Sequence, residues 1–267
     1  MSGDMPRDFD AHPGIGPARW VLRIGVAIQC GIAAVYAWTY PTPINGFLFM
    51  HMDWGDDACT LVDRGIAGFL ALIGLAVLAR PRGLILAPFA FFFLLWAAAE
   101  AVTHSDDVGS MAVPAQAVRF AAPLALAFLC AYRERLWTAG DWILRLGVAV
   151  TFATHGWEAL QHHPPFIDLL LGSVDRLGLH ETLDMSEARA TSLLTVIGWM
   201  DLALALFVLV ARARVIVLWM TVWGLATAAS RYIEQADLGV LAATIRVLNG
   251  LGPFALFWLW QRPDRDD

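Results

Sequence analysis

Lysine is missing from this chain, because all 18 basic residues among its 267 residues are arginine. A retinal-type pigment is held through a lysine Schiff base, and the phosphate-binding P-loop contains a lysine, so both kinds of site are excluded. The formal net charge of −6 also leaves no basic face for nucleic acid. Pigment, P-loop and nucleic-acid-binding functions are therefore set aside.

Charge of either sign and cysteine are scarce as well. Charged residues make up 16% of the chain, against roughly 25% in ordinary globular proteins. Hydrophobic residues make up 58%, and the mean hydropathy is +0.60. So little charge cannot cover a protein surface for water, so the solvent of this chain must be largely lipid. Cys30, Cys59 and Cys130 form no C-x-x-C motif, which argues against dithiol exchange.

Eight apolar runs approach the roughly 20 residues that cross about 30 Å of hydrocarbon. They cover residues 20–40, 65–79, 84–103, 113–132, 142–160, 191–211, 215–232 and 238–260. The second run is short, and its helix is expected to begin near Leu61. Very tight turns at 80–82 and 212–214 require antiparallel neighbours. The sequence predicts an all-α, polytopic integral membrane protein of about eight transmembrane helices embedded in a lipid bilayer.

The arginines are distributed unevenly between the two sides that these spans define. Twelve of the 18 fall at the span ends on the side of the termini: Arg7, Arg19, Arg23, Arg80, Arg82, Arg133, Arg135, Arg145, Arg212, Arg214, Arg262 and Arg265. Because positive charge is retained on the cytoplasmic side, both termini are expected in the cytoplasm. We expect a multi-pass protein of a bacterial-type inner membrane.

The chain contains an internal duplication. The segment 20–27, with Trp20, Arg23 and Gly25, returns at 142–149, an offset of 122 residues (20 to 142). The arginine turn after Ala79 returns after Ala211, an offset of 132, and Arg119 returns as Arg246, an offset of 127. We expect two tandem four-helix bundles, at 20–135 and 136–260, with cytoplasmic tails at 1–19 and 261–267. Because each bundle has an even number of spans, the two repeats share one orientation.

The second repeat resembles the DoxX-like family of four-helix membrane proteins over about residues 142–260. The resemblance is carried by Leu144-Arg145-Leu-Gly147 leading to His155-Gly156-Trp-Glu-Ala-Leu160, then by Ile197-Gly198-Trp-Met-Asp201-Leu202 and the turn at Arg212. The chain departs from the family pattern at Glu158, where a lysine is usual, and at Asp201, where a glutamate is usual. The resemblance implies a membrane partner of redox enzymes, such as a subunit of a quinol oxidase system or a component of a thiol-stress complex.

The ionisable residues within the spans of the second repeat include His155, Glu158, Asp201 and Arg246. Each costs a few kcal/mol in a bilayer and therefore needs a reason to be there. His155 and Glu158 are spaced i, i+3 and share one helix face. Such a cluster could bind the head of a quinone and relay a proton. It could equally be an interhelical brace, with Asp201 paired to Arg246 and His155 bonded to backbone.

Further candidates lie nearby, namely Glu100, His104, Arg119 and Arg231. The first repeat has Ala33 and Tyr36 where the second has His155 and Glu158, so we expect one site per chain. Any site would be a ligand or proton-relay site, and no catalytic residue is assigned.

No metal site is expected. Glu100 and His104, at i, i+4, could share one ion, and Met50-His51-Met52 offers soft ligands that suit copper. Neither spacing reaches the specificity of a known metal site. Haem between spans needs paired deep histidines, and only His155 lies deep.

Residues 164–178 predict a short amphipathic helix on the outer membrane face, and residues 47–52 suggest a second one. These helices could close a cavity, dock a partner or simply connect spans.

Three functions remain open. The first is an accessory subunit of a redox or respiratory complex, contacting quinone and other membrane or periplasmic subunits; the second is a small-molecule binder or transporter; the third is a structural or assembly subunit. We expect a non-catalytic subunit rather than an independent enzyme. The sequence predicts no broken helices of the transporter type, since Pro88 and Pro123 read as single kinks and Pro253 lies near a span end.

Overall fold

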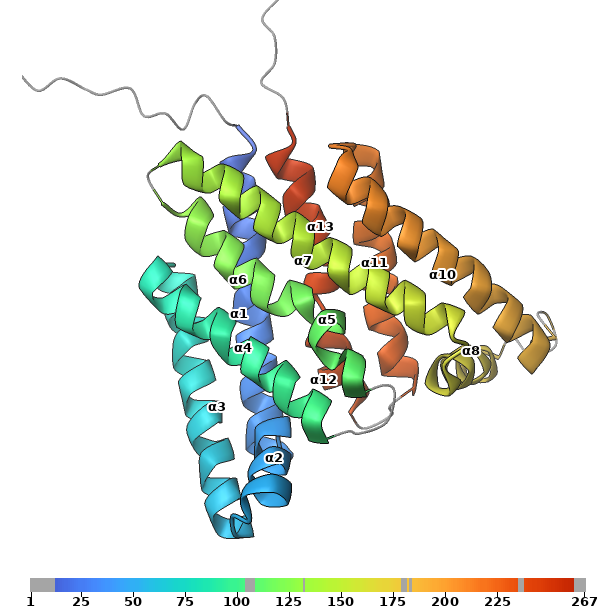
Figure 1. Cartoon of the computed structure of the whole chain (residues 1–267), viewed down its shortest axis with the longest axis horizontal. Helices are drawn as coiled ribbons and strands as arrows, with labels where there is room; N and C mark the ends of the chain where they lie inside the picture. Colours follow the sequence, from blue (N-terminus) through green and yellow to red (C-terminus); the bar gives the residue numbers. More distant parts are fainter. Residues whose placement is uncertain are drawn as a thin grey trace, which may run out of the picture.

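The computed structural model describes residues 13–103, 109–131, 133–178, 182, 184–234 and 238–261. Every regular element in these ranges is a helix (Figure 1), so the expected all-α class is confirmed. Six helical stretches among the described residues are long and apolar enough to cross a membrane. This is the architecture of a multi-pass membrane protein.

Five of these stretches are single helices. They are α1 (Ile15–Thr39), α3 (Asp56–Ala79), α4 (Gly83–Thr103), α10 (Glu187–Val210) and α11 (Arg214–Glu234). At 1.5 Å per residue, the 21 residues of α4 span roughly 31 Å, enough for a hydrocarbon core. Large apolar side chains on their outer faces are exposed, such as Leu72 at 69% and Val196 at 66%. This is the pattern of a surface solvated by lipid.

Several helices begin earlier than their predicted apolar runs. Helix α3 begins at Asp56 rather than near Leu61, and α7 (Glu134–Leu160) begins eight residues before position 142. Asp56 and Asp57 lie in the first turn of α3, where negative charge is favoured by the helix dipole. The acidic residues therefore extend the helix beyond its apolar run. Helix α7 has 27 residues and was predicted as a span, but it is not among the six.

The other two predicted spans, 113–132 and 238–260, are interrupted, so the prediction of unbroken helices is wrong. The first consists of the 3₁₀ turn η2 (Gly109–Met111), α5 (Ala112–Ala115) and α6 (Ala117–Leu129). The second consists of α12 (Gly239–Thr244) and α13 (Leu248–Leu259), and together these form the sixth membrane-length stretch.

The breaks follow from local hydrogen bonding. At the first break, Pro114 has no N–H to donate, and Gln116 N–H is shared between the carbonyls of Ala112 and Pro114. At the second, the N–H groups of Arg246, Val247 and Asn249 each reach back only three residues. Such i to i+3 bonds tighten the chain locally.

Two short helices connect long ones at the end remote from the termini. Helix α2 (Pro43–Met52) follows α1, and α8 (Pro164–Arg176) follows α7 (Figure 1). Both expected connectors are confirmed as helices.

Each short helix is held at its start by the long helix that follows it. Asp63 of α3, 4% exposed, accepts from Thr42 Oγ1 at 2.7 Å and from Asn45 Nδ2 at 2.6 Å. In the second half, Thr195 Oγ1 of α10 lies 2.8 Å from Nε2 of His162. Positions 63 and 195 differ by 132 residues, the offset of the repeated arginine turn.

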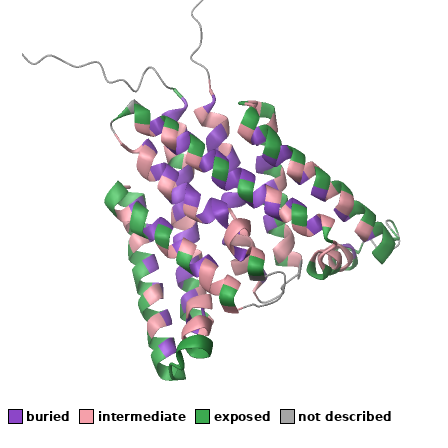
Figure 2. Ribbon diagram, viewed as in Figure 1, coloured by how far each residue is buried: buried purple, intermediate pink, exposed green. Residues whose placement is uncertain are grey.

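The long helices pack in matching pairs. Helix α1 packs on α3 as α7 packs on α10, and α4 packs on α6 as α11 packs on α13. The two halves meet where α1 contacts α13 and α6 contacts α7. Burial is greatest along these central crossings, and α3 and α10 form the exposed flanks (Figure 2).

The crossing of α7 and α10 is built on two glycines. A Cβ at Gly156 would lie 2.8 Å from the carbonyl oxygen of Gly198, and one at Gly198 would lie 2.7 Å from that of Gly156. The two backbones can therefore approach this closely only without side chains.

Arginine side chains cap four helices whose C-termini lie at the end of the bundle where α1 begins and α13 ends, here called the arginine end. Arg23 Nε donates to the Val77 carbonyl of α3 at 2.9 Å, and Arg19 Nε donates to the Leu129 carbonyl of α6 at 2.6 Å. In the second half, Arg145 Nε donates to the Val208 carbonyl at 3.0 Å, and Arg214 Nε donates to the Phe257 carbonyl at 3.2 Å. The last carbonyls of a helix have no partner within the helix, and cations are favoured there.

The repeated Trp-x-x-Arg segment thus has a structural role. Arg23 stacks over the ring of Trp20, with 4.4 Å between the guanidinium carbon and the ring centroid, and Arg145 stacks over Trp142 at 4.1 Å. Each guanidinium is covered by an indole while it caps the C-terminus of a neighbouring helix.

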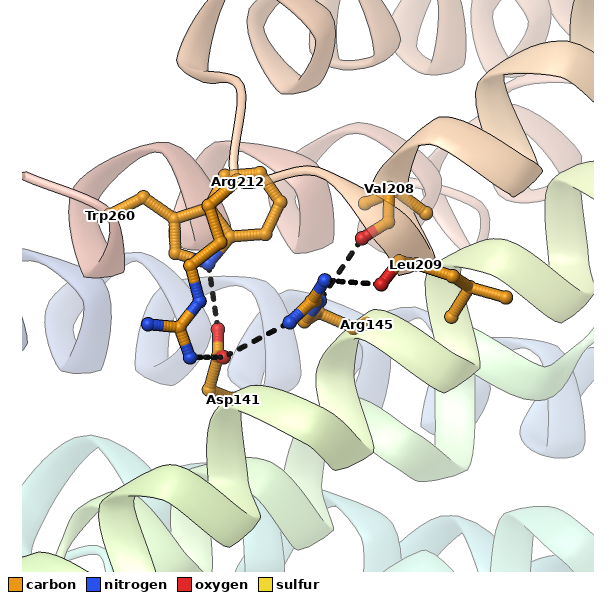
Figure 3. Close-up of polar contacts among 6 residues, drawn as sticks. All are labelled: Asp141, Arg145, Val208, Leu209, Arg212 and Trp260. Carbon is orange, nitrogen blue, oxygen red and sulfur yellow. Dashed lines mark hydrogen bonds and ion pairs between the residues drawn. The ribbon is translucent and has the colours of Figure 1, made fainter.

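In the second half this end also contains a buried carboxylate (Figure 3). Asp141 accepts from Arg212 Nη2 at 3.1 Å and from Trp260 Nε1 at 2.8 Å, and its carboxylate lies 3.8 Å from Nη1 of Arg145. It joins α7 to the α10–α11 turn and to the end of α13. Arg145 also donates to the Leu209 carbonyl at 2.5 Å.

Candidate functional site

Two adjoining cavities lie in the half of the bundle remote from the arginine end. The first has a volume of about 240 Å³ and is bounded by α7, α8, α10, α11 and the segment around the α12–α13 break. Its wall is mainly apolar and includes Phe152, Leu169, Leu170, Leu194, Ile197 and Trp223. We call it the apolar cavity.

The second cavity has a volume of about 520 Å³ and lies between the two halves of the chain. We call it the polar cavity, because its wall includes Tyr36, Glu100, Gln116, Arg119, His155, Glu158, His163, Arg231, Arg246 and Asn249. The volume of the polar cavity lies within the roughly 300–1,000 Å³ typical of small-molecule sites, and the apolar cavity is slightly smaller than that range.

Five residues line both cavities and define their junction: His155, Phe166, Arg231, Arg246 and Asn249. Three of these side chains are ionisable, one is a carboxamide and one is aromatic. Among the described residues, no carboxylate lines both cavities. The junction is therefore rich in hydrogen-bond donors.

His155 and Glu158 form a pair on α7, as their spacing predicted. Nδ1 of His155 lies 3.0 Å from Oε2 of Glu158, and their side chains are 31% and 12% exposed. Of the contacts predicted among His155, Glu158, Asp201 and Arg246, this pair is the one found in the described residues. Because the pair uses Nδ1, the Nε2 atom of His155 can contact a ligand.

Asp201 lies on α10 beside the glycine crossing and is 5% exposed. Its Oδ1 accepts from the indole Nε1 of Trp223 on α11 at 2.9 Å. Within the described residues no ion pair joins Asp201 to Arg246, and both residues line the apolar cavity. The brace considered from the sequence, with Asp201 paired to Arg246 and His155 bonded to backbone, is not the arrangement observed.

Arg119 and Arg246 lie at the two helix breaks. Arg119 Nη1 donates to Gln116 Oε1 at 2.7 Å, and Gln116 Nε2 donates to Glu100 Oε2 at 2.6 Å. Arg246 Nη1 donates to the carbonyl of Ala242 at 2.6 Å. Each break thus presents an arginine to the polar cavity.

The first break is supported by residues from both halves of the chain. Thr151 Oγ1 of α7 accepts from Val118 N–H at 3.0 Å, and Gln29 Nε2 of α1 donates to the Arg119 carbonyl at 3.3 Å. Positions 29 and 151 differ by 122 residues, the offset of the repeated Trp-x-x-Arg segment. The first contact satisfies an N–H in the first turn of α6, and the second satisfies the carbonyl that Pro123, four residues further on, has no N–H to bond.

Seven of the eight predicted site residues line the two cavities: Glu100, Arg119, His155, Glu158, Asp201, Arg231 and Arg246. The eighth, His104, lies outside the described residues. Met50, His51 and Met52 are exposed on α2 and line neither cavity. No group of three or more His, Cys, Asp or Glu side chains in the described ranges is placed to hold a metal ion.

Sequence reasoning missed several lining residues. Asn249 and Gln116 are uncharged polar residues within apolar runs, so their position could have indicated a role. Tyr36 belongs to the first repeat, and only the packing of the two halves places it in one cavity with second-repeat residues such as Glu158 and Arg246. The cavity is composite, with residues from both repeats.

Comparison of the chain with protein-family models, with curated proteins and with solved structures finds no match.

Proposed function

We propose that this protein binds a small amphipathic molecule, with the polar head at the junction and the apolar part in the apolar cavity. One observation carries the proposal: ionisable residues far apart in the sequence line two adjoining cavities of opposite character, which share five lining residues. Charged groups within a membrane segment are costly, and they are retained mainly where they serve a ligand or an ion. A pairwise brace would not require a cavity.

We also propose that the chain crosses the membrane eight times as two tandem four-helix bundles, and that its second repeat is DoxX-like. The matched helix pairs, the matched arginine caps and the position of both termini at one end support this arrangement. The membrane is a bacterial-type inner membrane with the arginine end on the cytoplasmic side, which the positive-inside rule supports.

An accessory subunit of a redox complex with bound quinone is a second candidate. The donors at the junction suit the carbonyl oxygens of a quinone, and the His155–Glu158 pair could take up or release its protons. Transport of the bound molecule is a third, because the breaks lie at corresponding positions of the two halves, as in many transporters.

Gentle purification from the native membrane, followed by mass spectrometry of small molecules and proteins and by a visible spectrum, tests these proposals. We expect a bound small molecule in the wild type, and its loss in His155→Ala and Arg246→Gln. The matched control is Arg189→Gln, which changes an exposed arginine outside both cavities. An empty wild-type protein, or retention of the molecule in both site variants, contradicts the proposal.

The same preparation separates the candidates. Co-purifying redox subunits favour the accessory role, and a solitary protein that moves the identified molecule across reconstituted vesicles favours transport. If the protein is solitary and does not move the molecule, simple binding remains.

A further inference from the structure

The apolar cavity is lined by both α10 and α11, and it reaches the molecular surface on α11. Ala226 and Thr227 of α11 line the cavity and are exposed at the molecular surface. Ala226 lies 12 residues beyond Arg214, where α11 begins, so the opening is roughly 18 Å along the helix. The opening is therefore within the length of an apolar helix rather than at its end.

The path of the helices explains the opening. Helices α10 and α11 are joined by a tight turn at the arginine end and diverge from it, and α8 lies against both at the remote end (Figure 1). Exposed apolar side chains flank the opening on both helices, with Val196 at 66% and Trp199 at 64% on α10 and Val222 at 57% on α11. Such a rim faces lipid and not water.

Behind the opening, the chemistry changes from apolar to hydrogen-bond donating. The apolar cavity leads to the junction, where His155, Arg231 and Arg246 meet Asn249. A guanidinium carries five N–H donors, so it can hold a protein carbonyl and still donate to a ligand. Asp201, the carboxylate of the apolar cavity, is engaged by Trp223. The junction therefore suits a head group that accepts hydrogen bonds.

We infer that the ligand is a membrane-dissolved amphiphile whose head carries acceptor oxygens, and that it enters from the lipid through the opening between α10 and α11. The inference rests on the proposed function, and it adds the chemical class of the ligand and its route. The head of the ligand passes through the apolar cavity to reach Arg231 and Arg246. The apolar part of the ligand remains in the apolar cavity beside Trp223.

The ligand class is tested with the purified protein in phosphatidylcholine nanodiscs. Trp223 lines the apolar cavity, so a bromine-labelled chain that enters it quenches tryptophan fluorescence in a saturable way. The probes are dibromostearate, with a carboxylate head, brominated lysophosphatidic acid, with a phosphate head, and a decyl-substituted benzoquinone, with a neutral acceptor head. Bromohexadecane has no acceptor and serves as the control.

We expect saturable quenching from at least one acceptor-headed probe, its loss in Trp223→Phe and Arg246→Gln, and only non-saturable quenching from bromohexadecane. Which of the three heads saturates identifies a carboxylate, a phosphate or a quinone as the source of the acceptor oxygens. The ligand class is overturned if bromohexadecane gives saturable quenching to the same extent as the acceptor-headed probes. It is also overturned if none of the three acceptor-headed probes gives saturable quenching.

The route is tested by narrowing the opening. In Ala226→Phe we expect saturable quenching to develop at least about tenfold more slowly, equivalent to about 1.4 kcal/mol of barrier. Val215→Phe adds the same ring to an exposed position at the start of α11, remote from the opening and outside the cavity lining, and should behave as wild type. Equal rates and amplitudes in the two variants overturn the lateral route.

The outcomes separate this inference from the proposed function. A native small molecule found by mass spectrometry, together with failure of all acceptor probes, leaves the proposed function standing and removes the ligand class. An empty native protein that also fails with every probe removes both.

Discussion

The two ends of this bundle use arginine in different ways. At the arginine end, Arg19, Arg23, Arg145 and Arg214 donate to C-terminal helix carbonyls. In the remote half, Arg119, Arg231 and Arg246 line two cavities. The first group satisfies the backbone of the protein, and the second presents donors to a space that can hold another molecule. The same residue type therefore builds the fold at one end and a candidate site at the other.

The contacts of Arg145 show why arginine suits the arginine end better than lysine. Arg145 bonds two carbonyls and lies beside Asp141 while stacking over Trp142. A planar guanidinium with several donors can make these contacts together, whereas an ammonium group cannot.

The largest effect is expected at the arginine end. Arg145→Ala leaves the Val208 and Leu209 carbonyls without their arginine donor, and because an unsatisfied buried carbonyl costs about 1–3 kcal/mol, the free energy of unfolding should fall by about 2–5 kcal/mol. Thermal unfolding in detergent measures it. Arg145→Lys keeps the charge and should recover part of the loss. A wild-type melting curve for Arg145→Ala would contradict the structural role of this arginine.

A smaller loss is expected where α7 crosses α10. The new methyl group of Gly156→Ala would meet the Gly198 carbonyl at 2.8 Å, and overpacking of this kind costs about 1–3 kcal/mol. Gly172→Ala is the matched control, because nothing lies within 4 Å of its Cβ position. Alanine is favoured over glycine within a helix by roughly 0.5–1 kcal/mol, so the control should melt slightly higher. Equal melting of the two variants would show that the crossing is not tight.

The support of the first helix break should contribute less. Thr151→Val removes the acceptor of Val118 N–H, and loss of such a bond costs about 1 kcal/mol. Chemical denaturation measures the loss of unfolding free energy. Thr39→Val is the control, because the Thr39 hydroxyl is exposed and bonds only within its own helix. If the two variants lose the same stability, the break does not depend on Thr151.

The smallest effect is expected from an exposed ion pair outside both regions. Nη1 of Arg189 lies 3.0 Å from Oδ2 of Asp184, and the two side chains are 58% and 87% exposed. Such pairs contribute little, so Arg189→Ala should change stability by no more than about 0.5 kcal/mol in the same denaturation experiment. A loss approaching that of Arg145→Ala would remove the distinction between structural and surface arginines.

The sequence predicted the helices well because apolar runs and tight arginine turns are local signals. The helix starts at Asp56 and Glu134 were missed, because charged residues extend a helix beyond its apolar run. The interruptions were missed because Pro114 and the short-range bonds around Arg246 do not stand out within an apolar run, and because the first break is also supported by partners distant in the sequence. Thr151 supports the backbone at Val118 from 33 residues away, and Gln29 supports Arg119 from 90 residues away.

The candidate site was predicted in part for a similar reason. A charge within an apolar run is visible in the sequence, and seven such residues line the cavities. Their partners were not predictable, because Asp201 meets Trp223 of the next long helix rather than the arginine that charge alone favours. The arrangement of Tyr36 beside second-repeat residues depends on how the two halves pack.

The most direct test of the central claim measures stability and ligand retention on the same two variants, Arg145→Gln and Arg246→Gln. Thermal unfolding in detergent and mass spectrometry of the purified protein give the two quantities. We expect Arg145→Gln to melt well below wild type while its folded fraction keeps the bound molecule. Arg246→Gln should lose the molecule and melt close to ligand-free wild type. Retention of the molecule by Arg246→Gln, or wild-type melting of Arg145→Gln, would contradict the division of roles between the two ends.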